Sequence, residues 1–297
     1  MKIQFLGTSA MQPTKERNPS SIFVNYETEN LLFDCGEGTQ RQMRIAGLKP
    51  TKITRVFISH YHGDHVFGIP GLLANLNANE YNKILHIYGP KGIEKFMEMV
   101  IQFARIKHGE LKIELHEIKE GKIFDSEKFY IDAYKLNHST ITYGFVIQEK
   151  DKRKINLDYL AKYGLKQHPI LGDLQKGKDI IWEGKKISAK KATTLISGKK
   201  VGIIFDTGMA DNCIAVGKNA DLLICECTFS ENEKEKAENY KHLTVKQSAT
   251  IAKKSKAKKL ILTHFSQRYK TISEIKKEAE NIFKNVECAE DFKEVIV

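Results

Sequence analysis

The amino-acid sequence predicts an α/β fold whose functional residues lie along one edge of a sheet. Apolar runs typical of buried strands alternate along the chain with segments of helical periodicity. Several of these runs end directly on a histidine or an aspartate, two of the side chains that most often bind metal ions. Residues 150–191 break the alternation. From these observations we expect a single domain over residues 1–297 with one inserted arm at about 150–191.

The expected elements follow one another at short intervals. Apolar alternation predicts strands over residues 1–7, 21–26, 30–35, 55–58 and 85–88, within 112–136, and over 144–148, 200–205, 220–225 and 259–264. Helical periodicity predicts helices over residues 40–45, 70–78 and 92–106. Thr244 and Gln247 form a capping box that opens a helix to about residue 254. A helix from about residue 273 and a short strand complete the chain.

Residues 59–65, Ser-His-Tyr-His-Gly-Asp-His, are a dense group of potential metal ligands. They follow a strand and precede a helix start, so they lie on a loop where side chains can converge. His60 and His62 project to the same side of an extended backbone and can hold one metal ion. Asp64 and His65 follow the turn at Gly63 and can reach a second. Imidazole and carboxylate without thiolate suit zinc, with manganese or iron as alternatives. The competing interpretation is a polar loop with incidental histidines.

Three more ligand-type side chains end other expected strands, namely His138, Asp206 and His264. Together with the first four they supply five imidazoles and two carboxylates, which divide over two metal ions with Asp206 between them. Two close metal ions can activate a water molecule and neutralise the charge that develops on a phosphodiester. Four histidines lack such settings, and we expect structural or surface roles for them: His86, His108, His116 and His168.

Composition indicates a soluble globular protein, with 41% hydrophobic and 29% charged residues. We expect no secretory signal at the start of the chain and no membrane partner, because no apolar run approaches the length of a membrane span. The five cysteines are odd in number and scattered. Free thiols in a reducing cytoplasm are the simplest interpretation.

The positive charge of the chain is concentrated in one segment. The formal net charge is +11, and residues 150–191 hold twelve Lys or Arg against five Asp or Glu, a balance of +7. The rest of the chain therefore carries only +4. This clustering favours contact with a polyanion over a general effect on solubility. A lysine-rich composition of the whole proteome is the alternative explanation for the total charge.

Four motifs give the sequence a resemblance to a known family. The His-x-His-x-Asp-His pattern of residues 60–65 is typical of the metallo-β-lactamase superfamily, which also holds thioesterases, lactamases and other nucleases. Narrower motifs are Pro-x-Lys-x-Arg-Asn at 13–18, Phe-Asp-Thr-Gly at 205–208 and Thr-His-Phe-Ser-Gln-Arg-Tyr at 263–269. With these, the sequence closely resembles the short form of the ribonuclease Z family of tRNA 3′-processing endonucleases, over nearly the whole chain apart from the arm.

The resemblance implies a metallo-β-lactamase four-layer αβ/βα sandwich with a projecting basic arm that clamps tRNA. It also implies a homodimer with two zinc ions per subunit. One zinc ion would be held by His60, His62 and His138, the other by Asp64, His65 and His264, and both by Asp206. The implied substrate is precursor tRNA, cut after the discriminator nucleotide to leave a 3′-hydroxyl on the tRNA and a 5′-phosphate on the trailer.

The resemblance also implies roles for residues beyond the ligand set. Asp64 would orient or deprotonate the nucleophile, and His242, oriented by Glu226, would protonate the leaving group. A surface histidine just before a helix cap is the alternative for His242. The loop at 13–18 would help to judge the tRNA 3′ end. We expect substrate contacts at five positions: Lys15, Arg17, Asn18, Thr244 and Arg268.

The sequence departs from the family pattern at three places. The family's His-Glu-Ala-Thr is Cys-Glu-Cys-Thr at 225–228, its His-Ser-Thr is His-Leu-Thr at 242–244, and the Gly-Pro pair of its arm is His-Pro at 168–169. Two other functions remain open. A thioesterase or small-molecule phosphodiesterase would use the same seven ligands but needs neither the basic arm nor the loop at 13–18. A non-catalytic RNA-binding protein is expected to have lost ligands, whereas all seven are present.

Overall fold

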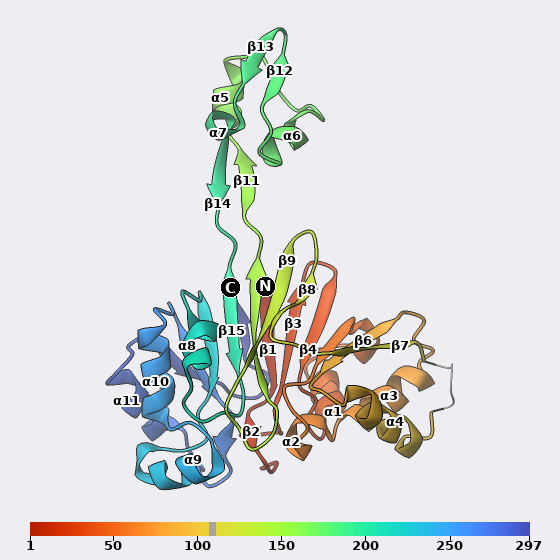
Figure 1. The fold of residues 1–297 in the computed structure, drawn as a ribbon, viewed down its shortest axis with the longest axis vertical. Helices are drawn as coiled ribbons and strands as arrows, with labels where there is room; N and C mark the ends of the chain where they lie inside the picture. Colours follow the sequence, from red (N-terminus) through yellow and green to blue (C-terminus); the bar gives the residue numbers. More distant parts are fainter. Residues whose placement is uncertain (107–110) are drawn as a thin grey trace. The chain divides into compact units, whose positions relative to one another are not determined.

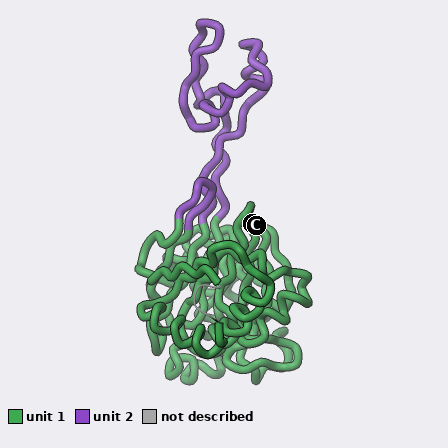
Figure 2. The backbone as a smooth tube through the Cα atoms, turned by 90° about the vertical axis from the view of Figure 1, so that its right-hand side faces the viewer, with its two compact units in different colours: residues 1–124, 131–147, 200–297 green, residues 125–130, 148–199 purple. Residues whose placement is uncertain are grey.

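The computed structural model describes residues 1–106 and 111–297. The chain divides into two compact units (Figure 2). Residues 1–124, 131–147 and 200–297 make up the larger unit, and residues 125–130 and 148–199 make up the smaller one. His108, expected to have a structural or surface role, lies outside the described residues.

The first of two large sheets has seven strands. Their order is β20 (Glu294–Ile296), β1 (Lys2–Gly7), β3 (Ser21–Tyr26), β4 (Glu29–Phe33), β5 (Arg55–Phe57), β6 (Leu85–Gly89) and β7 (Ile113–Glu117). The strands from β4 to β7 run parallel, whereas β20, β1, β3 and β4 pair antiparallel. Helices α1 (Thr39–Ile45), α3 (Ile69–Ala78) and α4 (Ile93–Phe103) bury their apolar residues against this sheet in one core cluster.

The second sheet also has seven strands. Their order is β19 (Val286–Cys288), β17 (Leu260–Thr263), β16 (Leu222–Glu226), β15 (Lys200–Ile204), β10 (Tyr143–Glu149), β9 (Phe129–Lys135) and β8 (Gly121–Asp125). Helices α8 (Asp211–Gly217), α10 (Val245–Lys254) and α11 (Ser273–Glu280) cover it (Figure 1). The predicted capping box at the start of α10 is confirmed, because the side chains of Thr244 and Gln247 each bond the other's backbone.

The two sheets pack face to face through aromatic rings. Phe33 and Phe57 of the first sheet stack at 4.9 Å, and Phe145 of the second sheet lies 5.4 Å from Phe33 and 5.9 Å from Phe57. Strands β16 and β17 are buried along their whole length, because helices cover one face and the other sheet covers the opposite face. The layers are therefore helices, sheet, sheet and helices (Figure 1). The expected α/β four-layer sandwich is confirmed.

Two expected elements end two or more residues earlier than the sequence predicts, each just before a residue or turn with positive φ. The strand expected over 30–35 ends at Phe33, because Asp34 has φ of 56° and turns out of the strand. The helix expected over 92–106 ends at Phe103, and Arg105, with φ of 55°, cannot continue it. Left-handed residues that are not glycine give no clear warning in a sequence.

The smaller unit contains regular structure that the sequence did not predict. Strand β11 (Lys152–Ile155) pairs antiparallel with β14 (Thr193–Ile196), and β12 (Ile180–Trp182) pairs with β13 (Lys185–Ile187). Three short helices accompany them, α5 (Leu157–Ala161), α6 (Leu171–Gln175) and α7 (Ala189–Ala192). Buried side chains that include Leu160, Leu174 and Ile187 form a separate apolar cluster. Elements of three to five residues are too short to show a periodicity.

The described residues contain no helix that is both long enough and apolar enough to cross a membrane. All five cysteines are buried as free thiols. The ends of the chain meet at one edge of the first sheet, where β1 pairs with β20 and the Met1 amine donates a hydrogen bond to the carbonyl of Val297 at 3.1 Å.

Candidate metal centre and active site

Seven histidine and aspartate side chains meet where strands of the two sheets end. His60 follows β5, and His62 is the N-cap of the short helix α2 (Gly63–Val66), which contains Asp64 and His65. From the second sheet, His138 follows β9, Asp206 follows β15, and His264 lies between β17 and β18 (Phe265–Ser266). The structure thus brings together all seven residues expected from the sequence.

Asp206 occupies the centre of this group. Its Oδ1 lies 3.2 Å from Nε2 of His65 and 3.1 Å from Nε2 of His264. Its Oδ2 lies 3.7 Å from Nε2 of His60 and 3.8 Å from Nε2 of His138. The two oxygens of one carboxylate therefore face two separate sets of imidazoles, as a bridging ligand would.

Each set has the donor types and spacing of a metal site. One consists of His60, His62, His138 and Asp206, and the other of Asp64, His65, Asp206 and His264, with the donor atoms of each set within 4.8 Å of one another. Tetrahedral zinc with bonds of about 2.0–2.1 Å separates its ligands by about 3.3 Å. Three buried atoms here, Nε2 of His60, Nε2 of His65 and Oδ1 of Asp206, have no hydrogen-bond partner among the described residues. Because buried polar atoms are normally satisfied, these residues fit metal ions.

Asp34 and Ser59 orient two of the imidazoles. Nδ1 of His65 donates to Oδ2 of Asp34 at 2.6 Å. The Ser59 hydroxyl donates to the same oxygen at 2.7 Å and therefore accepts from Nδ1 of His60 at 2.9 Å. The Ser59 backbone N–H donates to the other oxygen of Asp34 at 2.7 Å. Both rings are thereby held with the proton on Nδ1, which leaves the lone pair of Nε2 for a metal ion.

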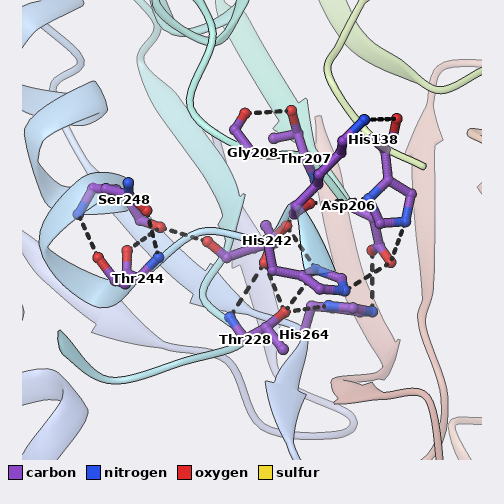
Figure 3. A network of polar contacts seen from close by, with 12 residues as sticks. His138, Asp206, Thr207, Gly208, Thr228, His242, Thr244, Ser248 and His264 are labelled. Atoms are coloured by element: carbon purple, nitrogen blue, oxygen red, sulfur yellow. Dashed lines mark hydrogen bonds and ion pairs between the residues drawn. The ribbon is translucent and has the colours of Figure 1, made fainter. Parts of the chain in front are cut away.

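Two other imidazoles are oriented in the same tautomer. Nδ1 of His138 donates to the carbonyl oxygen of Lys241 at 3.0 Å. The Thr228 hydroxyl donates to Oε2 of Glu226 at 2.7 Å, so its oxygen accepts from Nδ1 of His264 at 2.9 Å (Figure 3). In both rings Nε2 is again the free donor atom, and the fixed orientation reduces the conformational cost of binding a metal ion.

The electrostatics of the cluster favour a bound cation. Burial acts to lower the pKa of His65, but the carboxylates of Asp206 and Asp64 outweigh it and raise that pKa well above its usual value. Burial acts to raise the pKa of Asp206, yet His264 and His65 lower it well below its usual range. Burial lowers the pKa of His60, and the neighbouring His65 lowers it further. The ionised carboxylates thus attract positive charge to the centre, which a proton on His65 supplies in the absence of a metal ion and which a bound cation would replace.

His242 lies beside the metal ligands and is oriented by a buried carboxylate. Its Nδ1 is 3.0 Å from Oε1 of Glu226, and its Nε2 faces the cluster, 3.9 Å from Oδ2 of Asp206 (Figure 3). Glu226 is itself fixed by the backbone N–H of Thr207 at 2.7 Å and by Thr228. Burial acts to lower the pKa of His242, but Glu226 and Asp206 raise it to about 9. The ring therefore presents a protonated Nε2 to the cluster.

The loop at 13–18 is held at several points, and its expected contact residues differ in exposure. Lys15 is exposed. The guanidinium of Arg17 is buried and donates to the carbonyls of Ser266 at 3.4 Å and Tyr269 at 2.7 Å, so Arg17 fixes the loop instead of facing solvent. Asn18 donates from its side chain to the carbonyl of Glu37 at 2.6 Å.

Asp291 fastens the same loop to the sheet. Its carboxylate accepts from the backbone N–H of Asn18, the hydroxyl of Thr8 and the side-chain amide of Gln42, each at 2.8 Å. The backbone N–H of Met11 donates to Oδ2 of Asp64 at 2.8 Å. The backbone two residues before the loop is therefore bonded directly to a ligand of the metal cluster.

The other two expected substrate contacts also have partners within the protein. Thr244 is fully buried, caps α10 and donates to Oε2 of Glu231 at 2.8 Å, so its side chain does not reach solvent. Arg268 pairs with Glu233 at 2.8 Å and lies over the ring of Phe229, with its side chain 40% exposed. Arg268 can reach a substrate, whereas Thr244 stabilises the segment that carries His242.

Sequence reasoning missed four residues that organise the site: Asp34, Ser59, Thr228 and Asp291. Asp206 was identified because it directly follows a buried strand, and the same criterion would have identified Asp34. Ser59 precedes the first ligand, but a hydroxyl beside a histidine is common in loops. Thr228 and Asp291 act from distant segments, and nothing local distinguishes them from other buried polar residues.

The fold and the cluster together define a metallo-β-lactamase-fold protein with two adjacent sets of metal ligands. The chain is similar in structure to the metallo-β-lactamase-fold protein YhfI from Bacillus subtilis, with a TM-score of 0.72 and 21% identity over 99% of this chain and 98% of that one. It is also similar to human tRNase Z, short form, with a TM-score of 0.73 and 29% identity over 100% of this chain and 99% of that one.

The sequence comparisons narrow this class. The curated Ribonuclease Z of Streptococcus gordonii is 38% identical over 310 aligned residues, which cover 99% of both chains. Residues 1–168 match the family model described as anti-Pycsar protein Apyc1. The chain therefore belongs to the ribonuclease Z family, and over its first 168 residues also to the family of the Apyc1 model.

Proposed function

We propose that the protein is a metal-dependent endoribonuclease that removes the 3′ trailer from precursor tRNA. The products are a 3′-hydroxyl on the tRNA and a 5′-phosphate on the trailer. The observation that carries this proposal is the pair of ligand sets sharing Asp206, in a chain that is 38% identical to a ribonuclease Z over 99% of its length. A thioesterase or small-molecule phosphodiesterase is not favoured, because the full-length similarity includes the smaller unit.

The proposed metal ions are two zinc ions, with manganese or iron as alternatives. His60, His62 and His138 would hold one, Asp64, His65 and His264 the other, and Asp206 both. Imidazole and carboxylate donors without thiolate suit these metals. When bound, such ions polarise the phosphodiester and lower the pKa of water.

Asp64 contributes orientation of the attacking water. One of its oxygens is already engaged by the Met11 N–H at 2.8 Å and lies 3.4 Å from Nε2 of both His65 and His264. A carboxylate held at so many points keeps a fixed direction for its remaining lone pairs. It can therefore accept a hydrogen bond from the water and align it with the phosphorus.

His242 supplies the proton for the leaving oxygen. Glu226 accepts from its Nδ1 and so stabilises the protonated ring, while Nε2 is directed at the cluster. An imidazole held in this way can donate from Nε2 to the 3′ oxygen as it departs. Glu226 touches neither water nor substrate in this arrangement, and it acts by positioning His242.

Binding of the tRNA is divided between two places. Lys15, Asn18 and Arg268 lie on segments beside the metal cluster and are suited to the 3′ end, whereas Arg17 and Thr244 hold those segments. The segment 150–191, with its balance of +7, binds the tRNA backbone as an inserted arm of a single domain. We extend the proposal to a cytoplasmic homodimer, an assembly that light scattering on the purified protein tests.

A cleavage assay on precursor tRNA tests the proposal. Purified protein is expected to release an intact trailer, to lose this activity with a chelator and to regain it with added zinc. End analysis should find a 3′-hydroxyl on the tRNA and a 5′-phosphate on the trailer. Chelator-sensitive hydrolysis of a thioester or a small phosphodiester, with precursor tRNA left uncut at any metal concentration, would establish the alternative.

A further inference from the structure

A second group of ligand-type side chains lies at the open edge of the first sheet. Strands β6 and β7 are parallel, with His86 paired to Glu114 and Tyr88 to His116. Residues that are paired or two apart share a face of a sheet, so the two histidines and the glutamate project from the same face. The intervening Ile87 and Leu115 pack into the apolar core on the other face.

The donor atoms of this group are as close as those of a metal site. Nδ1 of His86 lies 3.1 Å from Nε2 of His116 and 3.3 Å from Oε2 of Glu114. All three donor atoms lie within 4.8 Å of one another. These separations are near the about 3.3 Å expected between ligands of tetrahedral zinc. Three donors with a fourth position open to solvent is a common arrangement for zinc.

The rings are held in place by the packing beneath them. The ring of His116 stacks on Tyr88 at 4.4 Å, and Tyr88 stacks in turn on Phe57 at 4.7 Å. The hydroxyl of Tyr88 accepts a hydrogen bond from Arg55 at 3.2 Å. With strand pairing fixing both backbones, the two imidazoles have little conformational freedom to lose when a metal ion binds, and only the exposed Glu114 side chain has to be ordered.

The charges around the group are compatible with a cation. Glu114 contributes a carboxylate to the site. Arg55 is a cation that acts on both rings, but it pairs with Glu29 at 3.3 Å and lies over the ring of Phe124, which reduces its repulsion. Burial lowers the pKa of both His86 and His116, which keeps their nitrogen lone pairs available at neutral pH.

We propose that His86, Glu114 and His116 bind one zinc ion at this sheet edge, separate from the cluster around Asp206. Because β7 is the outermost strand of its sheet, the ion would fasten it to β6. The side chains are partly exposed, 23% for His86 and 53% for Glu114, so binding is expected to be weaker than in the buried cluster. The site is independent of the proposed tRNA cleavage.

Zinc uptake tests this proposal without reference to activity. Wild-type protein and three variants are dialysed against a series of free zinc concentrations, and bound zinc per chain is measured by elemental analysis. Glu114→Gln removes the charged donor from an exposed position, and His116→Phe removes a nitrogen but keeps a ring on Tyr88. His168→Phe is the matched control, since His168 is an exposed histidine of the smaller unit.

The expected result is one more zinc ion per chain in the wild type and in His168→Phe than in the other two variants. The affinity of this last ion should fall at least tenfold in Glu114→Gln, and the rise in Tm between low and high zinc should be smaller there. Equal zinc uptake by wild type and Glu114→Gln would overturn the proposal. His86 and His116 would then be a hydrogen-bonded pair of rings with a structural role at the sheet edge. Glu114→Gln decides the matter even if His116→Phe does not fold.

Discussion

The two compact units hold their polar residues in opposite ways. In the larger unit, His60, His65 and His264 are buried and each ring is fixed by a second residue such as Asp34 or Thr228. The smaller unit instead has a small apolar cluster and an exposed surface rich in lysine. All the lysines of residues 150–191 are exposed: Lys150, Lys152, Lys154, Lys162, Lys166, Lys176, Lys178, Lys185, Lys186, Lys190 and Lys191.

This difference matches two physical requirements. Metal binding and proton transfer need atoms placed to a fraction of an ångström in a dry site. Attraction of a polyanion needs only a density of charge, and it weakens with salt. If the two units divide the work in this way, substitutions in each should affect different measurable quantities.

The largest effect is expected from the metal cluster. His62→Ala removes an exposed ligand and should reduce the metal bound by the cluster around Asp206 from two ions to one without unfolding the protein. Loss of cleavage should exceed the roughly 10²–10⁴-fold typical of a missing proton donor. A small chromogenic phosphodiester should be affected as severely as precursor tRNA. An active variant whose cluster holds one ion or none would contradict the shared-ligand interpretation, and His168→Ala is the control for bound metal and for the chromogenic substrate.

The next effect concerns proton transfer. His242→Ala should slow the cleavage of precursor tRNA by roughly 10²–10⁴-fold with bound metal unchanged. A chromogenic substrate, whose leaving group needs no proton, should lose much less. Glu226→Gln should reduce tRNA cleavage in the same direction by a smaller factor. Equal losses on both substrates would mean that His242 supports the metal cluster instead of the leaving group.

Removing the tip of the smaller unit should change binding but not chemistry. Residues 156–192 can be replaced by Asn-Gly, because Ile155 and Thr193 are paired in an antiparallel ladder that a two-residue turn can close. This deletes eight lysines. KM for precursor tRNA should rise at least about tenfold and its salt dependence should flatten. Turnover of the chromogenic phosphodiester should not change.

A charge-only variant sharpens this comparison. Replacing Lys185, Lys186, Lys190 and Lys191 with Gln keeps the apolar cluster intact, since all four side chains are exposed. It should give a smaller rise in KM in the same direction. Equal loss on tRNA and on the chromogenic substrate in the deletion variant would make the segment a part of the fold, not a binding arm.

The smallest effect is on stability and concerns Asp291. Burial raises the pKa of Asp291 to about 6, even though Asn18 and Thr8 donate hydrogen bonds to it. The folded protein therefore binds more protons than the unfolded chain between about pH 4 and pH 6, and this contribution to the free energy of unfolding falls as pH rises through that window. The difference is at most about 3 kcal/mol. Denaturant unfolding at several pH values should show this decline in the wild type but not in Asp291→Asn. If the free energy of unfolding fell equally with pH in both proteins, a group other than Asp291 would be responsible.

The sequence by itself predicted which residues come together as potential metal ligands. Strand-like runs that end on His60, Asp206 and His264 predict metal ligands at strand ends. The expectation that they share one sheet edge was wrong, because β5 belongs to the first sheet and β15 and β17 belong to the second. The capping box at Thr244 could be predicted because it depends on two residues three positions apart. Local patterns of this kind depend on spacing alone and survive in the sequence without the fold.

Only the tertiary structure decided how those ligands are held. Asp34 and His65 are 31 positions apart, and Thr228 and His264 are 36 apart, so no local pattern connects either pair. Arg17 and Thr244 were expected to contact the substrate, but both are buried and bond other parts of the protein, so they support their loops. From the sequence, His86 and His116 were expected to have structural or surface roles. Their proximity could not be foreseen, because it arises from the pairing of β6 with β7. Contacts between distant segments depend on packing, which composition and periodicity do not encode.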